Sequence, residues 1–205
     1  INRGKIDFTM NHTFQVGETK AIKVQDIMVR DIVYTNNWKY PIYFAVTVSP
    51  DSKIGLDNYL WFHGLAFRLE PRAVPDADRG LDPSIVEQNL LHQPEIPSRT
   101  PQYGYRFRGI ADPKVYYDEN TSRLMTNYRS AYIRLALYYS NALKDKPKAA
   151  AILDKMDTVI PRSKIPLGWD VQSDIANFYL QLGRRGAFDT LTTEIEPEMR
   201  QMIAA

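Results

Sequence analysis

The positions of hydrophobic residues along the chain change their period several times, and each period predicts a different element. Alternation at residues 5–9 and 20–24, on either side of the turn signal Val16-Gly17-Glu18, predicts two short strands. A spacing of three or four over residues 25–35 predicts a helix that stops at Asn36-Asn37, because asparagine tolerates left-handed backbone geometry. The expected buried face of this helix is formed by Val24, Ile27, Met28, Ile32 and Val33.

The next segment contains the longest apolar run of the chain. Residues 42–48 are almost continuously apolar and β-branched or aromatic, as in a strand whose two sheet faces are both covered by helices. A loop at 49–54, a short helix at 56–62 and a strand at 65–69 are expected to follow. This order predicts an α/β domain over residues 1–118, with a mixed sheet, flanking helices and right-handed crossovers.

The middle of the chain is expected to be a connecting region. Residues 72–101 are rich in proline, aspartate and glycine, with one short helical pattern at 83–91. Alternation returns at 102–108 and predicts an edge strand. Its two sides are Tyr103, Tyr105 and Phe107, which face inward, and Arg106 and Arg108, which face solvent.

The C-terminal third has a helical period throughout and predicts four helices. The first helix is capped by Asp118 or Asn120, and the second starts near Pro147 and ends at Pro161. The third helix ends at Gly183. The fourth starts at Ala187 and is broken or kinked at Pro197. Two helical pairs in succession predict tetratricopeptide-like hairpins over residues 119–205, packed on the α/β domain. Because Tyr138-Tyr139 and Phe178-Tyr179 stand 40 residues apart, whereas the usual period is about 34, two hairpins without a true repeat are the alternative.

The composition narrows the classes of function. The 205 residues carry a net charge of +2, from 26 basic and 24 acidic side chains, so no long-range field argues for nucleic acid or an anionic membrane. The absence of cysteine excludes disulfides, thiol catalysis and thiolate metal sites. No apolar run approaches the ~20 residues of a membrane span, so insertion of this chain into a membrane is not expected. The start at Ile1, without an initiator methionine or a signal pattern, predicts a fragment or a processed product.

Residues 31–71 combine the buried-strand signature with a distinctive series of aromatic, asparagine and glycine residues. The series is Asn36-Asn37-Trp38-Lys39, Pro41-Ile42-Tyr43-Phe44, Gly55-Leu56, Tyr59-Leu60, Gly64-Leu65-Ala66 and Arg68, with a second island from Asp112 to Asn120. In these residues the chain resembles the segment that follows the membrane region in the family called domain of unknown function 2723. That family includes the transmembrane protein 260-like protein O-mannosyl-transferases. The resemblance spans roughly residues 26–161.

The resemblance implies a place for this chain within a larger protein. Members of the family look like multi-span membrane glycosyltransferases that use a lipid-linked sugar donor, with the transfer chemistry in the membrane half and a soluble domain after it. This chain would then be the soluble, extracytoplasmic (periplasmic) part, without catalytic residues of its own, because the membrane motifs are not present. It would assist binding of the acceptor, a glycan or a partner protein, next to the parent membrane domain.

No complete catalytic motif accompanies these patterns. Asp76-Ala77-Asp78 matches the Asp-x-Asp pattern that holds a divalent cation on the diphosphate in many nucleotide-sugar glycosyltransferases. It stands in a proline-flanked stretch beside two arginines, where a solvated acidic turn is favoured. His12, His63 and His92 lack the spacing of a zinc site, and His63, at a helix–strand junction, is expected to be structural. No metal and no cofactor is expected.

Ligand-binding residues are predicted from topology and residue type. The candidates are Ser49, Asp51, Lys53, Arg106 and Arg108. The first three follow the carboxyl end of the central strand, where ligands enter open α/β sheets. The two arginines stand among aromatic residues that could stack on a sugar, whereas one such strand does not make a nucleic-acid platform. At the opposite end of the strand, Asn37 and Trp38 are expected to stop the helix and to cover the bottom of the sheet.

Two other functions stay open at this point. One is an independent soluble glycosyltransferase that uses Asp76 and Asp78 with a metal ion. The other is a purely structural module whose helical hairpins dock a partner protein.

Overall fold

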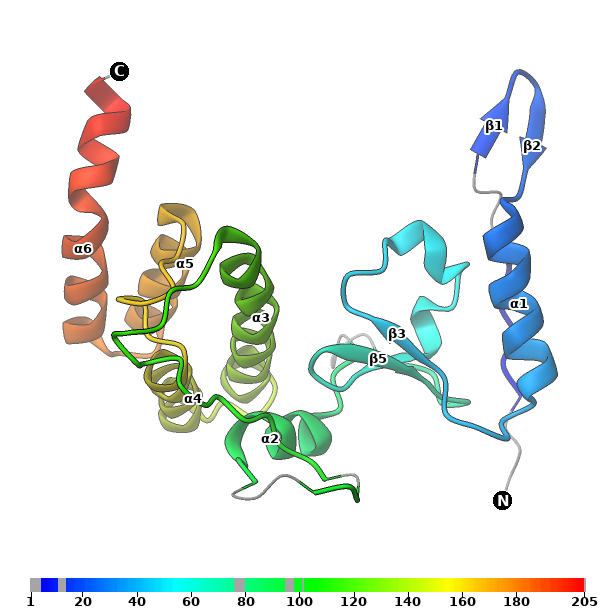
Figure 1. The fold of residues 1–205 in the computed structure, drawn as a ribbon, viewed down its shortest axis with the longest axis horizontal. Coiled ribbons are helices and arrows are strands. Elements are labelled where there is room, and N and C mark those ends of the chain that lie inside the picture. The colour runs from blue at the N-terminus through cyan, green and yellow to red at the C-terminus, as the bar shows by residue number, and fades with distance from the viewer. Residues whose placement is uncertain (1–4, 11–13, 76–79, 95–97, 101, 205) are drawn as a thin grey trace. The chain divides into compact units, whose positions relative to one another are not determined.

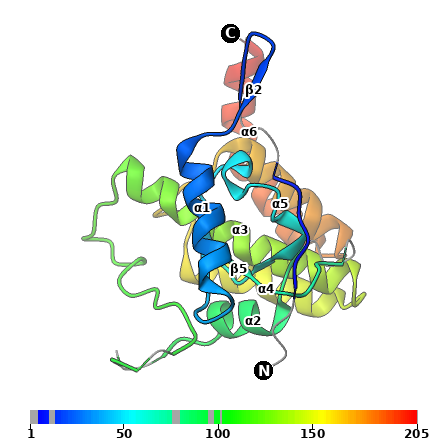
Figure 2. The same cartoon turned by 90° about the vertical axis from the view of Figure 1, so that its right-hand side faces the viewer.

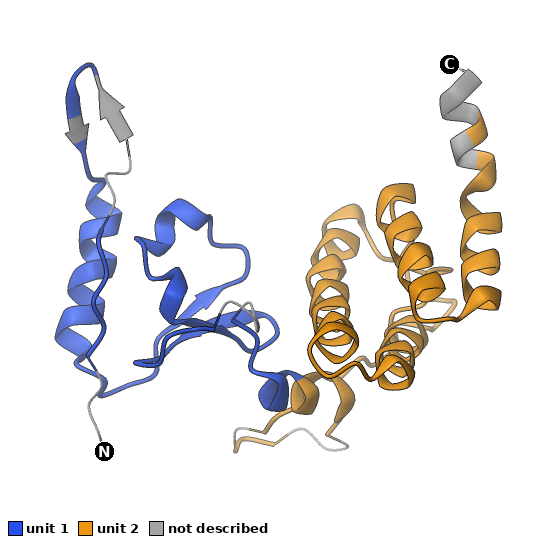
Figure 3. Cartoon of the chain, turned by 180° about the vertical axis from the view of Figure 1, so that it is seen from behind, with its two compact units in different colours: residues 1–86 blue, residues 87–205 orange. Residues whose placement is uncertain are grey.

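The chain folds into two compact units, Ile1–Val86 and Glu87–Ala205 (Figure 3). The computed structural model describes residues 5–10, 14–75, 80–94, 98–100 and 102–204. The first unit combines small sheets with a helix and the second is helical, so the predicted α/β class with C-terminal helical hairpins is confirmed. The predicted domain boundary after residue 118, and the packing of the helical region on the α/β domain, stay predictions.

Unit 1 begins with an extended segment and a hairpin. β1 (Phe14–Val16) pairs antiparallel with β2 (Thr19–Ala21) around Gly17, whose φ of 60° suits a residue without a side chain (Figure 1). Residues 5–10, in contrast to the prediction, are not a strand. The hydroxyl of Tyr59 accepts from the N–H of Asp7 at 3.3 Å and donates to its carbonyl at 3.1 Å, so a side chain takes the backbone groups that a strand partner would bond.

Helix α1 (Val24–Asn36) has apolar residues on two faces, and the face predicted to be buried is the wrong one. Asp26 is buried and Val29 and Val33 pack against the core of unit 1. The predicted face is exposed instead, with the single exception of Val33: the exposed residues are Val24, Ile27, Met28 and Ile32. Spacing alone could not decide between the faces, because both carry apolar residues three or four positions apart.

A three-stranded antiparallel sheet forms the middle of unit 1, in the order β3 (Tyr43–Ala45), β5 (Ala66–Leu69), β4 (Leu60–Phe62). The connection from β4 to β5, residues 63–65, is a hairpin. β3 and β4 both run antiparallel to β5, and residues 46–59 cross over from one edge of the sheet to the other. β3 is shorter than the predicted strand at 42–48, and its burial alternates. Only one of its faces is therefore covered.

The predicted short helix at 56–62 is replaced by a turn and a strand. The 3₁₀ turns η1 (Pro50–Lys53) and η2 (Asp57–Tyr59) lead into β4, which pairs with β5 from Leu60 onward. Pairing with β5 overrides the local helical spacing. The sheet face that carries Phe44, Leu60 and Leu69 forms part of the core of unit 1. This core consists of Phe44, Ile54, Leu56, Leu60 and Leu69, with Trp38, Ile42, Val29 and Val33 at its edge.

Unit 2 is built from two helical hairpins (Figure 1, Figure 2). The short helix α2 (Pro83–Leu91) begins in unit 1 and ends in unit 2. The hairpins are α3 (Glu119–Asn141) with α4 (Lys146–Val159), and α5 (Trp169–Gln181) with α6 (Arg185–Ala204). No helix in the described part of the chain has the length and the apolar content that a membrane span needs.

The helix boundaries of unit 2 follow their capping residues. Asp118 accepts from the N–H of Thr121 at 2.8 Å, which confirms one of the two predicted caps of α3. Asp145 accepts from the N–H of Lys148 at 3.0 Å and caps α4, with Pro147 in its first turn as predicted. α6 runs through Pro197 to Ala204, so of the two predicted outcomes the break does not occur and the kink stays a prediction.

Residues 102–108 form no described strand; the N–H of Tyr105 donates instead to the carbonyl of Asn89 in α2, at 2.7 Å. Of the three side chains predicted to face inward, two do so, whereas Tyr103 is 50% exposed. The rings of Tyr105 and Phe107 pack edge-on against Tyr128 of α3, with centroids 5.2 and 5.3 Å away. Arg106 and Arg108 point to solvent.

Candidate functional site

A groove lined by described residues of unit 2 lies between α3 and α5, the first helices of the two hairpins, and has a volume of about 650 Å³. Its lining is apolar on both sides: Ile133 and Leu137 stand one turn apart on α3, and Ile175 and Phe178 stand on the facing side of α5. Leu180, at its edge, is 41% exposed. A volume of this size is typical of sites that enclose a small ligand or a few residues of a peptide. We call this feature the α3–α5 groove.

Polar groups line one side of the α3–α5 groove. Asp174, Asn177 and Gln181 all belong to α5, at spacings of three and four, so they share one face of the helix. Their side chains are exposed and make no hydrogen bond or ion pair with other described residues. Asp174 is the one charged residue of the lining as the structure describes it. These three side chains are therefore free to contact a ligand.

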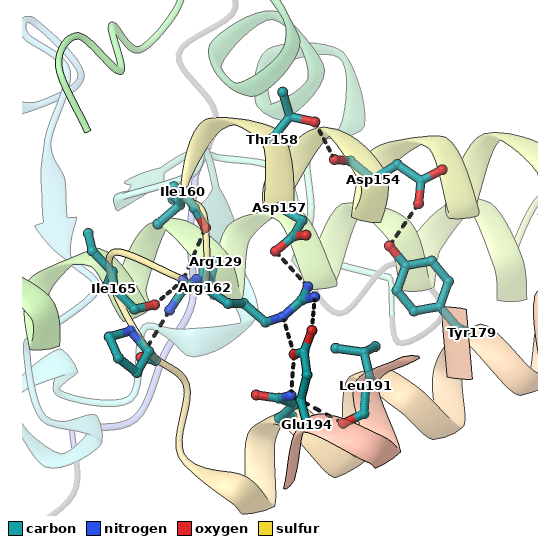
Figure 4. A network of polar contacts seen from close by, with 12 residues as sticks. Arg129, Asp154, Asp157, Thr158, Ile160, Arg162, Ile165, Tyr179, Leu191 and Glu194 are labelled. Carbon is teal, nitrogen blue, oxygen red and sulfur yellow. Dashed lines mark hydrogen bonds and ion pairs between the residues drawn. The ribbon is translucent and has the colours of Figure 1, made fainter. Parts of the chain in front are cut away.

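An ion-pair network ties the two hairpins together (Figure 4). Arg162, in the connection between α4 and α5, donates from Nε and Nη2 to the two carboxylate oxygens of Glu194 on α6, at 3.1 and 3.2 Å. Its Nη1 lies 2.6 Å from Asp157 on α4. Burial opposes the charge of Arg162, but Glu194 and Asp157 outweigh it and raise the pKa of the guanidinium. Gln172 of α5 also donates to Glu194, at 2.8 Å.

A buried arginine fixes the same connection from the other side. Arg129 of α3 is 2% exposed, and its guanidinium donates to the carbonyls of Ile160 and Ile165, the first at 3.0 Å (Figure 4). Burial lowers the pKa of Arg129 to about 10, a shift that nearby Asp157 opposes. At neutral pH this side chain stays charged. Arg129 thus ties α3 to the connection that leads into α5.

A second contact joins the two hairpins through the same face of α4, one turn away from Asp157. The hydroxyl of Tyr179 on α5 donates to Asp154 on α4 at 2.9 Å, and Arg184 lies 3.3 Å from the same carboxylate. Burial and the hydrogen bond to Asp154 raise the pKa of Tyr179. A smaller polar cavity of about 370 Å³ adjoins Arg162 and Glu194. Because these charges already pair with each other, this cavity offers a ligand less than the groove does.

Unit 1 holds a second charged cluster, on the sheet face opposite its core. The Nε2 of His63 lies 3.9 Å from Glu70 and 3.9 Å from Asp82. Arg72 reaches both carboxylates, at 3.2 and 3.8 Å, and stacks on the ring of Trp61 at 3.5 Å. Burial lowers the pKa of His63, although Asp82 and Glu70 oppose the shift. We call this set the His63 cluster; its two arginines, Arg68 and Arg72, balance its two carboxylates.

The geometry of the His63 cluster gives no sign of catalysis. Asp82 accepts from the N–H of Ile85 at 3.2 Å and so also begins α2. Among the described residues, no group of three or more histidines, cysteines or carboxylates could hold a metal ion. Because each carboxylate faces an arginine, the arrangement favours a structural network, and the structural role expected for His63 stays a prediction.

The whole His63 cluster lies in the part of the chain that one family model covers. Residues 4–89 match the model of TMEM260-associated domain 2. The match links this region of the chain to the TMEM260-related family. No curated protein and no solved structure matches the chain. The TMEM260-associated region therefore coincides closely with unit 1, and the groove lies outside it.

The residues predicted to bind a ligand fall in both units. In the TMEM260-associated region, Ser49 bonds Ser52 across η1 with 3.1 Å between the hydroxyls, and Asp51 is exposed. Lys53 is mostly covered, because its ammonium pairs with Asp57 at 3.5 Å and lies over a phenylalanine ring. Arg106 and Arg108 belong to unit 2. Asp76 and Asp78 lie outside the described residues, as do His12 and Arg79.

The groove residues were missed because their sequence signal is ordinary. Ile175 and Phe178 stand at helical spacing on α5, but an apolar stripe on a helix more often marks the core than a binding site. Asp174, Asn177 and Gln181 look like any solvated helix face. Only the contact between hairpins shows that they border a groove.

Proposed function

We propose that this chain is an accessory domain of a TMEM260-like protein and that it binds a segment of a partner polypeptide in the α3–α5 groove. The observation that carries the proposal is the combination of an open apolar channel with uncommitted polar side chains along one edge. Binding surfaces for peptides combine these features, because apolar pockets supply affinity and polar groups fix orientation. The proposal assigns the α3–α5 groove as the binding surface of the predicted helical-hairpin module.

The other charged features of the molecule favour a structural role. Arg129 and Arg162 are saturated by carbonyl and carboxylate partners, and the His63 cluster is balanced within itself. Glycan binding by Ser49, Asp51, Lys53, Arg106 and Arg108 is a proposal of its own, supported by the exposure of the two arginines beside aromatic residues. Loss of glycan-array binding after joint substitution of both arginines by serine tests it.

The identity of the parent protein is a finer proposal. The sequence resemblance supports a multi-span membrane glycosyltransferase whose extracytoplasmic part includes this chain. Sequencing the coding region upstream of the codon for Ile1 tests this, because several apolar segments of about 20 residues each are expected there. A parent without such segments contradicts it.

Selection of peptides on the purified 205-residue chain tests the groove. Random peptides of about twelve residues, displayed on phage, are enriched for binding and then measured as synthetic peptides. Substitution Leu180→Glu, at the exposed edge of the groove, is expected to weaken binding at least about tenfold. Leu143→Glu is the matched control, because Leu143 is 53% exposed and is not part of the groove lining.

Two results would contradict the proposed function. One is the failure of any peptide to become enriched. The other is enrichment of peptides that bind both variants as well as they bind the natural chain. Melting temperatures of the two variants within a few degrees of the natural chain ensure that a loss of binding is not a loss of fold.

A further inference from the structure

The polar edge of the α3–α5 groove selects the conformation and the charge of its occupant. We infer that the groove takes an extended peptide that runs along α5 and carries a lysine or an arginine opposite Asp174. The inference rests on the proposed function and names the kind of partner that the site fits. It depends on three side chains, Asp174, Asn177 and Gln181.

The spacing of the two amides matches an extended backbone. Asn177 and Gln181 are four residues apart on α5, which places them about 6 Å apart along the helix axis. Alternate residues of an extended chain repeat every ~6.6 Å and point to the same side. Each amide has both a donor and an acceptor, so each can pair with the N–H and C=O of one such residue. Two amides in this register therefore bind two alternate residues of the same peptide.

A helical occupant would not use these groups. The backbone N–H and C=O groups of a helix are bonded within the helix, except at its ends. Asn177 and Gln181 would then contact only side chains of the occupant. Their amides would form no hydrogen bonds better than those they already make with water. The polar edge therefore favours an extended peptide over an amphipathic helix, although the apolar lining alone would accept either.

The charge of the peptide is set by Asp174. It is the one charge in the described lining and has no ion-pair partner among the described residues. An anionic side chain placed there would be repelled, whereas a lysine or arginine would form an ion pair at the rim of an apolar site. Asp174 stands one turn before Asn177, so the cation is expected just beyond the first backbone contact. Apolar side chains on the other side of the peptide would reach Ile133, Leu137 and Phe178.

The peptide most enriched by display is the probe for this inference. Its affinity for the full chain is measured by fluorescence anisotropy, with its basic residue kept or replaced by glutamate. The natural chain is expected to prefer the basic form by about tenfold or more, and Asp174→Lys to reverse the order. N-methylation of the peptide is expected to weaken binding about tenfold at two alternate positions and to have little effect at the position between them.

The outcomes separate this inference from the function on which it rests. If no peptide binds in the groove, both fail. If a peptide binds and Leu180→Glu abolishes binding, but charge and N-methylation have no effect, only the inference fails. A peptide that becomes helical on binding, shown by circular dichroism, also overturns it. So does a dimer of the free chain that Leu180→Glu dissociates, because the groove would then hold a second copy.

Discussion

The side chain of Asn36 bonds both backbone groups of Tyr40. Its Nδ2 donates to the carbonyl of Tyr40 at 2.7 Å, and its Oδ1 accepts from the N–H of Tyr40 at 3.1 Å. Between them, Asn37 and Trp38 have φ values of 44° and 59°, in the left-handed region that residues with side chains avoid. The amide of Asn36 thus closes a strained turn, and the turn places Trp38 against the core of unit 1. The helix stop predicted at Asn37 is confirmed, whereas the cover that Trp38 was predicted to give the bottom of the sheet stays a prediction.

Removal of the Asn36 amide is expected to destabilise unit 1. Asn36→Ala loses two hydrogen bonds that hold the strained turn, so the free energy of unfolding should fall by about 1–2 kcal/mol. Asn37→Gly is the control, because glycine adopts a φ of 44° without strain and should leave stability unchanged or slightly raised. Urea unfolding of both variants measures the difference. Equal stabilities would mean that the amide does not hold the turn.

Substitution of the buried Arg129 is expected to lower the free energy of unfolding strongly. Arg129→Met keeps the length of the side chain but leaves the carbonyls of Ile160 and Ile165 buried without a donor, which should cost about 3 kcal/mol. Arg123→Met, on the exposed face of the same helix, should stay within about 0.5 kcal/mol of the natural chain. Chemical denaturation followed by the ellipticity of the helices measures both. A loss of stability of similar size in the two variants would contradict the role of Arg129.

The lowered pKa of His63 predicts that the free energy of unfolding falls as pH drops below neutrality. Burial holds its pKa in the folded protein below the ordinary value of 6.5, so the unfolded chain takes up the proton first as pH falls. The free energy of unfolding therefore does not depend on this histidine above pH 6.5 and falls progressively below it. His63→Gln should remove this part of the decline, whereas His92→Gln, at an exposed histidine, should retain it. Urea midpoints across this range test the variants, and a folded-state pKa above 6.5, measured by NMR, would refute the argument.

Local signals in the sequence predicted the ends of elements well. Asp118 and Pro147 mark helix starts, and Asn36-Asn37 marks a helix stop, because caps and turns depend on side chains a few residues away. What failed were choices that depend on distant partners. Residues 102–108 alternate like a strand but lack a strand to pair with, and residues 60–62 form β4 because β5 lies beside them.

The candidate site could not be predicted for a related reason. Asp174 and Asn177 become notable only because Ile133 and Leu137 of another hairpin face them. That relationship depends on Arg129 and Arg162, which bridge positions more than 30 residues apart. A periodic pattern describes one helix at a time and contains no information on which helix lies opposite.

The two faces of α1 give the sharpest test of the fold of unit 1. Val29 and Val33 pack on the core, whereas Met28 and Ile32 are 59% and 56% exposed. Truncation of either valine to alanine should therefore lower the free energy of unfolding by about 1–2 kcal/mol, since buried methyl groups are lost. Met28→Gln and Ile32→Gln should change it by less than about 0.5 kcal/mol, because their side chains already contact water. The reverse order would show that the face predicted from spacing is the buried one in solution, and that a partner surface or another part of the chain covers it.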